Sequence, residues 1–263
     1  MNDSSAHILW KTKFTHFAIT AFFVVATAVT VLVFLLVYRI RAVNIENCVY
    51  SNKESVMEAT EIKLGMHSYA IDKEEMAERI MASNPYICNV HITRESATTL
   101  RIDITEDAPR FYISYNGKYI ILSETLRVLA ECESEAELLS LSVAPIKLPD
   151  VEKSELGKTL VFTEEAEEDG KECIELLSML AESSLSGVIT HADFSERFNI
   201  AVTYNNKYEI RFGSPKNFAD KLSLVIDTIE ELENPLNGYS TAKGIIHASV
   251  TGETSFEATG AIS

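Results

Sequence analysis

The feature that most constrains this chain is a long uncharged run from Phe17 to Tyr38, FAITAFFVVATAVTVLVFLLVY. As an α-helix its 22 residues would cover about 33 Å, enough to cross the hydrocarbon core of a bilayer with slight tilt. A cleavable signal peptide has a shorter apolar core, about 7–15 residues, and a small-residue cleavage site, whereas this run ends in YRIRA. We therefore predict an uncleaved transmembrane helix over 17–38. The alternative is a buried helix of a soluble domain.

The charges that flank this run bear on its orientation. Lys11 and Lys13 precede it and Arg39 and Arg41 follow it, so the positive-inside rule only weakly favours a cytoplasmic tail over residues 1–16. The rest of the chain, residues 43–263, would then lie outside the membrane. It carries 38 acidic and 19 basic side chains, a net charge of −19. Such a surface would repel nucleic acid and anionic lipid, and it suits protein partners with basic patches.

Residues 43–109 carry strand and helix signals in the order β-α-α-β-β. The expected elements are a strand at 41–51, helices at 53–62 and from 72 to 84, and a hairpin over 89–109. Asp72 and Glu75 resemble a capping box at the start of the second helix. In the hairpin, Leu100 and Ile102 share one face and polar residues occupy the other. The pattern predicts three strands whose apolar side is covered by two helices.

Residues 110–252 are predicted to form a second, larger domain. Asn116-Gly117 and Asn205-Asn206 indicate two tight hairpin turns, because these residues tolerate positive φ. The expected elements are hairpins at 111–122 and 197–213, helices near 164–181 and 214–235, a last strand at 244–252, a bridging loop at 134–160 and an unstructured polar tail at 253–263. The predicted fold class is α+β, with one N-terminal transmembrane helix, the β-α-α-β-β domain and a larger antiparallel β domain with helices.

The sequence lacks the motifs of catalytic and metal sites. There is no GxSxG, HExxH, Walker or GxGxxG pattern, and the six histidines are isolated. The cysteines lie far apart rather than at metal-ligand spacing, so free and mostly buried thiols are expected at Cys48, Cys88, Cys132 and Cys173. The acidic run near Glu164 is better explained by the helix dipole than as glycosidase carboxylates. We predict no catalytic residue, no cofactor and no metal.

The most specific stretch runs from Asp72 to Pro109, DKEEMAERIMASNPYICNVHITRESATTLRIDITEDAP. Its helix, its proline, V-x-I-x-R, a short turn, T-L-x-I-x-[IV]-x-E and a second proline resemble the pattern of the FtsQ/DivIB family of bacterial cell-division proteins. The resemblance covers nearly the whole chain and implies a POTRA domain at 43–109 followed by a β domain at 110–252. The chain departs from the family at His247, where an acid is usual, and at Asn47-Cys48, where a glycine is usual.

This resemblance implies a non-enzymatic, membrane-anchored scaffold of the cell-division machinery. Such a protein binds DivIC/FtsB-like and FtsL-like partners outside the membrane, acts with septal peptidoglycan synthases, and lies at the division septum. It binds no nucleic acid. Two alternatives come from the same sequence: a POTRA-type module for protein export or folding, and a wall-facing peptidoglycan enzyme.

In the family the partner adds a strand beside the last strand of the β domain, which implies a binding site near the end of this sequence. An exposed strand edge offers unpaired backbone groups for such pairing. The predicted partner-binding residues are Gly244, Ile245, Ile246, His247, Ala248, Ser249 and Val250, with Phe256 as an anchor for the added segment. Packing of Phe256 on its own domain is the alternative for that side chain.

Overall fold

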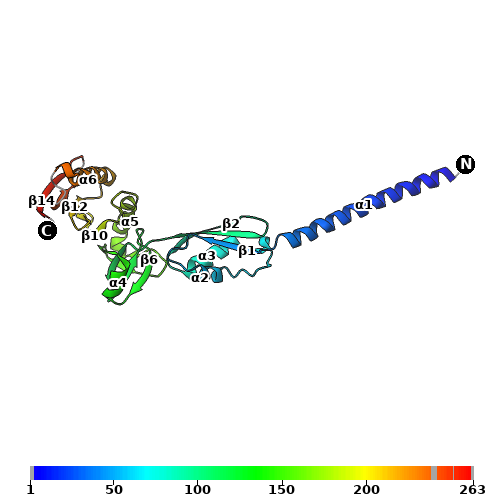
Figure 1. Cartoon of the computed structure of the whole chain (residues 1–263), viewed down its shortest axis with the longest axis horizontal. Coiled ribbons are helices and arrows are strands. Elements are labelled where there is room, and N and C mark those ends of the chain that lie inside the picture. Colours follow the sequence, from blue (N-terminus) through cyan, green and yellow to red (C-terminus); the bar gives the residue numbers. More distant parts are fainter. Residues whose placement is uncertain (1–2, 238–241, 251, 262–263) are drawn as a thin grey trace. The chain divides into compact units, whose positions relative to one another are not determined.

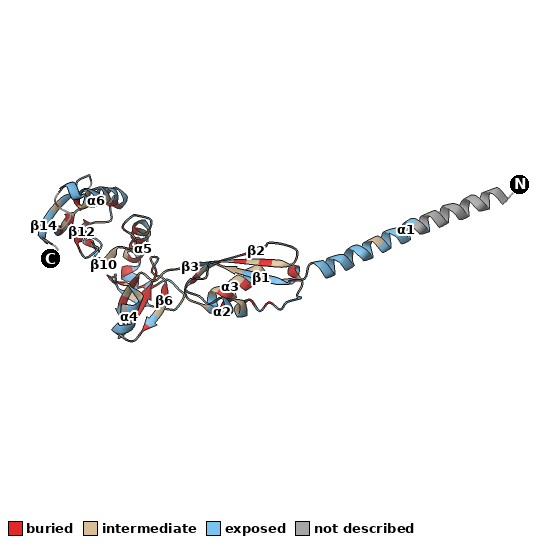
Figure 2. Cartoon of the chain, viewed as in Figure 1, coloured by how far each residue is buried: buried red, intermediate tan, exposed pale blue. Residues whose placement is uncertain are grey.

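The computed structural model describes residues 3–237, 242–250 and 252–261 (Figure 1). Helix α1 (Asp3–Val37) contains the apolar run. Its segment Ile19–Val37 has a mean hydropathy of 2.7, and none of its most apolar window is buried in the protein; Figure 2 shows this part almost wholly as exposed. The helix is therefore long and apolar enough to cross a membrane, as the sequence predicted.

Contacts divide the chain into two compact units, and the first contains α1 and a three-stranded sheet. The other elements of this unit are β1 (Ala42–Glu46), α2 (Lys53–Thr60), the 3-10 turn η1 (Ser68–Ala70), α3 (Lys73–Ser83), β2 (Ile87–Arg94) and β3 (Thr99–Glu106). The strand order is β1-β3-β2, with β1 parallel to β3. The predicted β-α-α-β-β order is confirmed.

Local chemistry explains where the helices of the first unit begin and end. Asp72 accepts a hydrogen bond from the amide of Glu75 at 3.1 Å, which is the predicted cap of α3. Helix α2 ends earlier than predicted because Glu61 takes a left-handed conformation, with φ of 55°. The two helices lie on one side of the sheet (Figure 1). Val56 and Met76 are buried together with the apolar face of β2 and β3, so the predicted one-sided sheet is confirmed.

The second unit contains a nine-stranded sheet in the order β14-β13-β12-β11-β10-β7-β4-β5-β6. The strands are β4 (Phe111–Tyr115), β5 (Lys118–Leu122), β6 (Val128–Cys132), β7 (Ala144–Lys147), β10 (Ile189–Asp193), β11 (Ile200–Tyr204), β12 (Tyr208–Gly213), β13 (Ala242–His247) and β14 (Ser255–Ala261). A separate pair is formed by β8 (Val151–Lys153) and β9 (Val161–Phe162). The helical elements are α4 (Glu135–Leu141), η2 (Glu164–Ala166), α5 (Glu167–Ala181), α6 (Phe218–Glu233) and η3 (Pro235–Asn237).

Turn and helix signals in the second unit behave as predicted. Asn116 and Gly117 have φ of 51° and 77°, and Asn205 and Asn206 have φ of 51° and 52°, the left-handed values that tight hairpin turns require. Helices α5 and α6 bury their apolar stripes in the main core, which contains Cys173, Leu176, Leu177, Leu180, Phe218, Leu222, Val225, Ile229 and Leu232. These side chains hold both helices on the sheet.

Three expectations for the second unit are wrong. The sheet is mixed rather than antiparallel, because β7 runs parallel to β4 and β10, and β12 runs parallel to β13. The expected loop 134–160 contains α4, β7 and β8. Pro145 is tolerated within β7 because each neighbouring strand pairs with only two residues there. The expected polar tail 253–263 contains β14, a strand with few apolar residues.

A buried ammonium group fixes the start of α6. The side chain of Lys221 is 1% exposed, and its Nζ donates to the backbone oxygens of Phe212 and Ser214 at 2.8 Å each. Burial lowers the pKa of this group. The two hydrogen bonds tie α6 to the end of β12, and so hold the helix against the half of the sheet that includes β13 and β14.

Candidate functional site

The predicted partner-binding segment lies near one border of the nine-stranded sheet, but it does not form that border. Strand β13 pairs in parallel with β12 on one side and antiparallel with β14 on the other. The expectation of a free edge at Gly244–Val250 is therefore wrong. The physical reason is that the segment after β13 folds back and uses the β13 backbone groups itself, as Ser255 pairs with His247 and Glu257 with Ile245.

The structure also separates the predicted residues by their burial. Ile246 and Ala248 are fully buried in the core, and Gly244 is buried as well. Ile245 and His247 are half-buried on the opposite face, where the Nε2 atom of His247 lies 3.4 Å from the Oε2 atom of Glu257. Ser249 and Val250 are exposed beyond the end of β13. A partner could therefore reach few of these side chains directly.

Phe256 packs on its own domain. Its ring lies 5.8 Å from the ring of Tyr208 in an edge-to-face arrangement, and it belongs to the layer around the main core. A Cβ atom on Gly244 would lie 2.4 Å from the Phe256 ring and 2.3 Å from the backbone oxygen of Glu257. Only glycine fits at this position, so Gly244 and Phe256 together hold β14 close against β13.

The outer border of the sheet is β14, and the hydrogen-bond pattern shows which of its residues face outward. The amides of Gly244 and Ala248 donate toward β12. Backbone groups alternate in direction along a strand, so Ile245 and His247 face β14 and bond to their partners Glu257 and Ser255. The alternate residues of β14, Phe256 and Ala258, consequently direct their amide and carbonyl groups away from β13.

Sequence reasoning missed β14 as the border strand. The available signal was weak: in SFEATGA only Phe256 is large and apolar, and Ala258 follows it at the spacing of one strand face. Gly260 and Lys243 pair beyond a register shift next to Gly244, which leaves Thr259 as an extra residue in the strand. This bulge makes the alternation in the sequence irregular.

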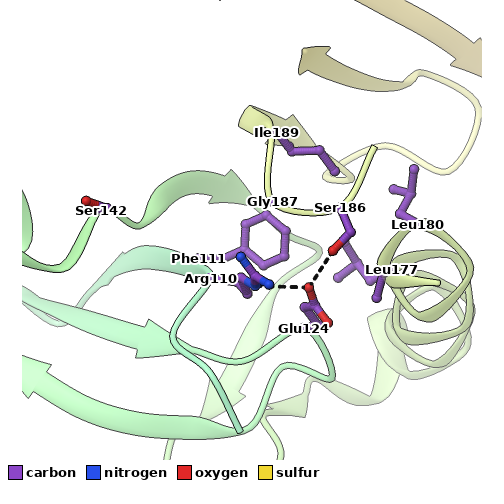
Figure 3. A pocket seen from close by; sticks show the side chains of 10 residues that line it. Arg110, Phe111, Glu124, Ser142, Leu177, Leu180, Ser186, Gly187 and Ile189 are labelled. Carbon is purple, nitrogen blue, oxygen red and sulfur yellow. Dashed lines mark hydrogen bonds and ion pairs between the residues drawn. The ribbon is translucent and has the colours of Figure 1, made fainter. Parts of the chain in front are cut away.

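A small cavity in the second unit lies where α5 approaches the start of β4 (Figure 3). Its volume is about 40 Å³, and two of its lining side chains meet Glu124: the Nε atom of Arg110 lies 3.1 Å from Oε1, and Ser186 donates to the same oxygen at 3.0 Å. One water needs about 10–15 Å³ of such space, and ligand pockets usually have about 300–1,000 Å³. This cavity fits a few water molecules rather than a substrate.

The acidic run at the start of α5 is neutralised by basic side chains. Glu167 lies 2.6 Å from Lys171, and Arg197 lies 3.5 Å from Asp169 and 2.9 Å from Glu172. The hydrogen bond from Lys171 lowers the pKa of Glu167. A glycosidase acid needs a raised pKa, so the electrostatics of Glu167 are wrong for that role. Within the described residues, no group of three His, Cys, Asp or Glu side chains has the arrangement of a metal site.

Comparisons with known proteins agree with this architecture. Residues 38–107 match the family described as "POTRA domain, FtsQ-type". Over 220 residues the chain is 24% identical to "Cell division protein DivIB" of Clostridium botulinum, both in strain Loch Maree / Type A3 and in strain Hall, and the alignments cover 82% of this chain and 83% of each relative. Residues 38–107 therefore match an FtsQ-type POTRA domain, and most of the chain is similar to DivIB cell-division proteins. These similarities support a division-related role for the chain.

Among solved structures, the major extracytoplasmic domain of DivIB from Geobacillus stearothermophilus is similar. It is 19% identical, and the match covers 45% of this chain and 87% of that one with a TM-score of 0.27. Among the described residues one helix is long and apolar enough to cross a membrane, and together with the similarity to DivIB it supports a single-pass membrane protein with a division-related role.

Proposed function

We propose that this protein is a non-enzymatic scaffold of the divisome. Its N-terminus would lie in the cytoplasm, and its POTRA domain (43–109) and the β domain that follows, with β14 included, would lie outside the membrane at the septum. Its partners would be DivIC/FtsB-like and FtsL-like proteins, and through them it would help to control septal peptidoglycan synthesis. The observation that carries the proposal is the place of β14 as the outermost described strand of the nine-stranded sheet, in a chain similar to DivIB.

The site that we propose is strand addition beside β14. Ala258 directs its backbone amide and carbonyl groups outward there, and an incoming strand would bond to these groups. The residues predicted from the sequence would then support β14 rather than contact the partner. Ile245 and His247 pair with β14 through backbone hydrogen bonds, and Gly244 leaves space for the Phe256 ring. Ser249 and Val250, exposed between β13 and β14, lie at the end of the border where an added segment would begin or finish.

The proposal is tested by Ala258→Pro. Proline removes an amide hydrogen, and the amide of Ala258 is on the outer side of β14, so the ladder to β13 keeps its bonds. We expect the full-length protein to fold but to lose about tenfold or more in affinity for the DivIC/FtsB-like partner, since one ladder hydrogen bond and the approach of the incoming strand are lost. The matched control is Ala258→Ser, which keeps the amide.

The measurement is co-purification of the partner with full-length protein from detergent-solubilised membranes, followed by a titration of the purified pair. If Ala258→Pro binds as tightly as Ala258→Ser while both proteins melt at the same temperature, the partner does not pair with β14. A charged residue at Ile246 would be a poor test, because this side chain is fully buried and the variant would lose its fold.

A further inference from the structure

The last turn of α1 packs against a loop of the first unit through aromatic rings. The ring of Phe34 lies 4.9 Å from the ring of His67 and 5.3 Å from that of Tyr69, and the ring of Tyr38 lies 5.3 Å from Tyr69. Nε2 of His67 is also 3.4 Å from the backbone oxygen of Phe34. These contacts bring residues that are thirty positions apart in the sequence to the same level along the helix.

Backbone hydrogen bonds fix this loop beside the end of α1. The amide of Ser68 donates to the oxygen of Tyr38, that of Ile40 to the oxygen of Met66, and that of Gly65 to the oxygen of Ile40, each at 2.8 Å. Residues 63–69, which we call the collar loop, are therefore tied on both sides of Ile40. The loop has little freedom to move away from the helix end.

The position of the collar loop relative to the bilayer follows from the membrane-spanning segment. Ile19–Val37 is 19 residues long and covers about 28 Å as a helix, close to the thickness of the hydrocarbon core. Phe34 lies about 4.5 Å before the end of this segment. Because the rings of His67 and Tyr69 contact Phe34, they lie at the depth of the membrane interface, where Tyr side chains are enriched.

The collar loop exposes apolar side chains at this depth. Leu64 is 69% exposed, Tyr69 51% and Met66 39%. Three apolar side chains so close together on a seven-residue loop would be costly in water, and they bury usefully in the boundary between headgroups and acyl chains. The surface is continuous with the lipid-facing surface of α1, since Tyr69 contacts both Phe34 and Tyr38.

Basic groups surround the collar loop. The guanidinium of Arg94 lies 3.9 Å from the centre of the Tyr69 ring and donates to the oxygen of Ser68 at 3.0 Å, Arg39 follows the span directly, and Lys63 is exposed. Exposed acids also lie near the loop: Glu58 and Glu61, which line a hollow together with Lys63 and Met66, and Asp72. Residues 43–263 carry a net charge of −19, so an anionic membrane would repel most of this protein. The basic side chains beside the end of the span are the groups that lipid phosphates can approach.

We propose that the collar loop is a phospholipid-binding surface. Leu64, Met66 and Tyr69 insert into the interfacial layer of the outer leaflet, and Lys63, Arg39 and Arg94 contact lipid phosphates. The bilayer then holds the POTRA domain at a defined angle on its anchor, rather than leaving it on a flexible tether. This role requires only the membrane span and is independent of partner binding at β14.

The proposal is tested with full-length protein in vesicles of phosphatidylcholine and phosphatidylglycerol. The single tryptophan, Trp10, is replaced by Phe, and one new tryptophan is introduced by Leu64→Trp or, as the control, by Val49→Trp. Val49 is 78% exposed and follows the far end of β1 from the membrane. In vesicles with brominated acyl chains we expect about a twofold or greater loss of fluorescence for Leu64→Trp and little loss for Val49→Trp.

If brominated lipid quenches the fluorescence of the two variants by the same fraction, whether that fraction is large or near zero, the proposal is wrong. The phosphate contact has its own test: added to the Leu64→Trp protein, Lys63→Gln should reduce the quenching in phosphatidylglycerol vesicles, and Lys53→Gln, at the start of α2, should not. If Lys63→Gln and Lys53→Gln change the quenching by the same amount, the basic side chains around the collar loop do not bind headgroups. Both lysines are exposed, so the fold is retained in each variant.

Discussion

The close contact between Gly244 and β14 gives the sharpest test of the proposed border. In Gly244→Ala the new Cβ would lie 2.3 Å from the Glu257 oxygen and 2.4 Å from the Phe256 ring, well inside the 3.4 Å at which ordinary contact begins. Overpacking of this kind costs about 1–3 kcal/mol. Relief of the clash with the Glu257 oxygen requires the β13 and β14 backbones to move apart, which weakens the ladder between them; the edge-to-face pair of Phe256 and Tyr208 contributes only about 0.5–1.5 kcal/mol against this movement.

We therefore expect β14 to separate from β13 in Gly244→Ala while the rest of the sheet stays folded. If the partner pairs with β14, its affinity should fall by about 5- to 150-fold, the equivalent of 1–3 kcal/mol. Amide hydrogen exchange should show loss of protection in β14 and not in β11 or β12. The matched control is Gly260→Ala in β14 itself, where a Cβ meets nothing within 4 Å.

Two results would refute this reasoning. Unchanged exchange in β14 would mean that the strand accommodates the methyl group without moving. Faster exchange in β14 with unchanged or tighter partner binding would show that the partner binds another surface. The first surface to examine would be the edge of β13 that the separation of β14 exposes. Gly260→Ala should behave as wild type in both measurements.

Two further predictions concern titratable groups in the second unit. Burial raises the pKa of Asp107, while a hydrogen bond with Cys88 and the charge of Arg127 oppose the shift. The protonated carboxyl is therefore favoured in the folded protein. Its contribution to stability is fully present below the ordinary pKa of 3.8 and is lost as the pH rises through the raised pKa. The melting temperature of Asp107→Asn should therefore rise relative to that of wild type as the pH increases through this window. A difference in melting temperature that stays constant with pH would contradict the raised pKa. Burial also raises the pKa of Cys173, which is 3% exposed. Iodoacetamide should modify half-buried Cys48 in the native protein before Cys173, and all four cysteines in urea, as read by mass spectrometry.

The sequence predicts the elements whose signals are local. The Asn116-Gly117 turn and the Asp72 cap depend on neighbouring residues alone, and both form as expected. The elements that the sequence misses depend on distant partners. Strand β7 is short and contains Pro145, and its place between β4 and β10 is set by parallel pairing with residues more than thirty positions away.

The sequence also misses the outermost strand of the sheet for a related reason. An edge strand needs apolar side chains on only part of one face, so β14 has a single large one, Phe256, and its sequence resembles a polar tail. Gly244 is the residue on β13 that allows β14 to pack closely, because the Phe256 ring occupies the space that a side chain at 244 would fill. That requirement cannot be read from the sequence without the pairing.

The two borders of the nine-stranded sheet differ in a way that favours β14 as the docking edge. At the β6 border the chain covers its own edge: the amide of Val128 donates to Lys158, and its oxygen accepts from Gly157, both at 2.8 Å. Exposed edges invite pairing unless they are covered, charged or bulged. The bulge next to Gly244 protects the second half of β14, so the proposed pairing would centre on Ala258. So short a ladder offers an incoming strand few backbone bonds, and most of the affinity and all of the specificity must come from side-chain contacts around it.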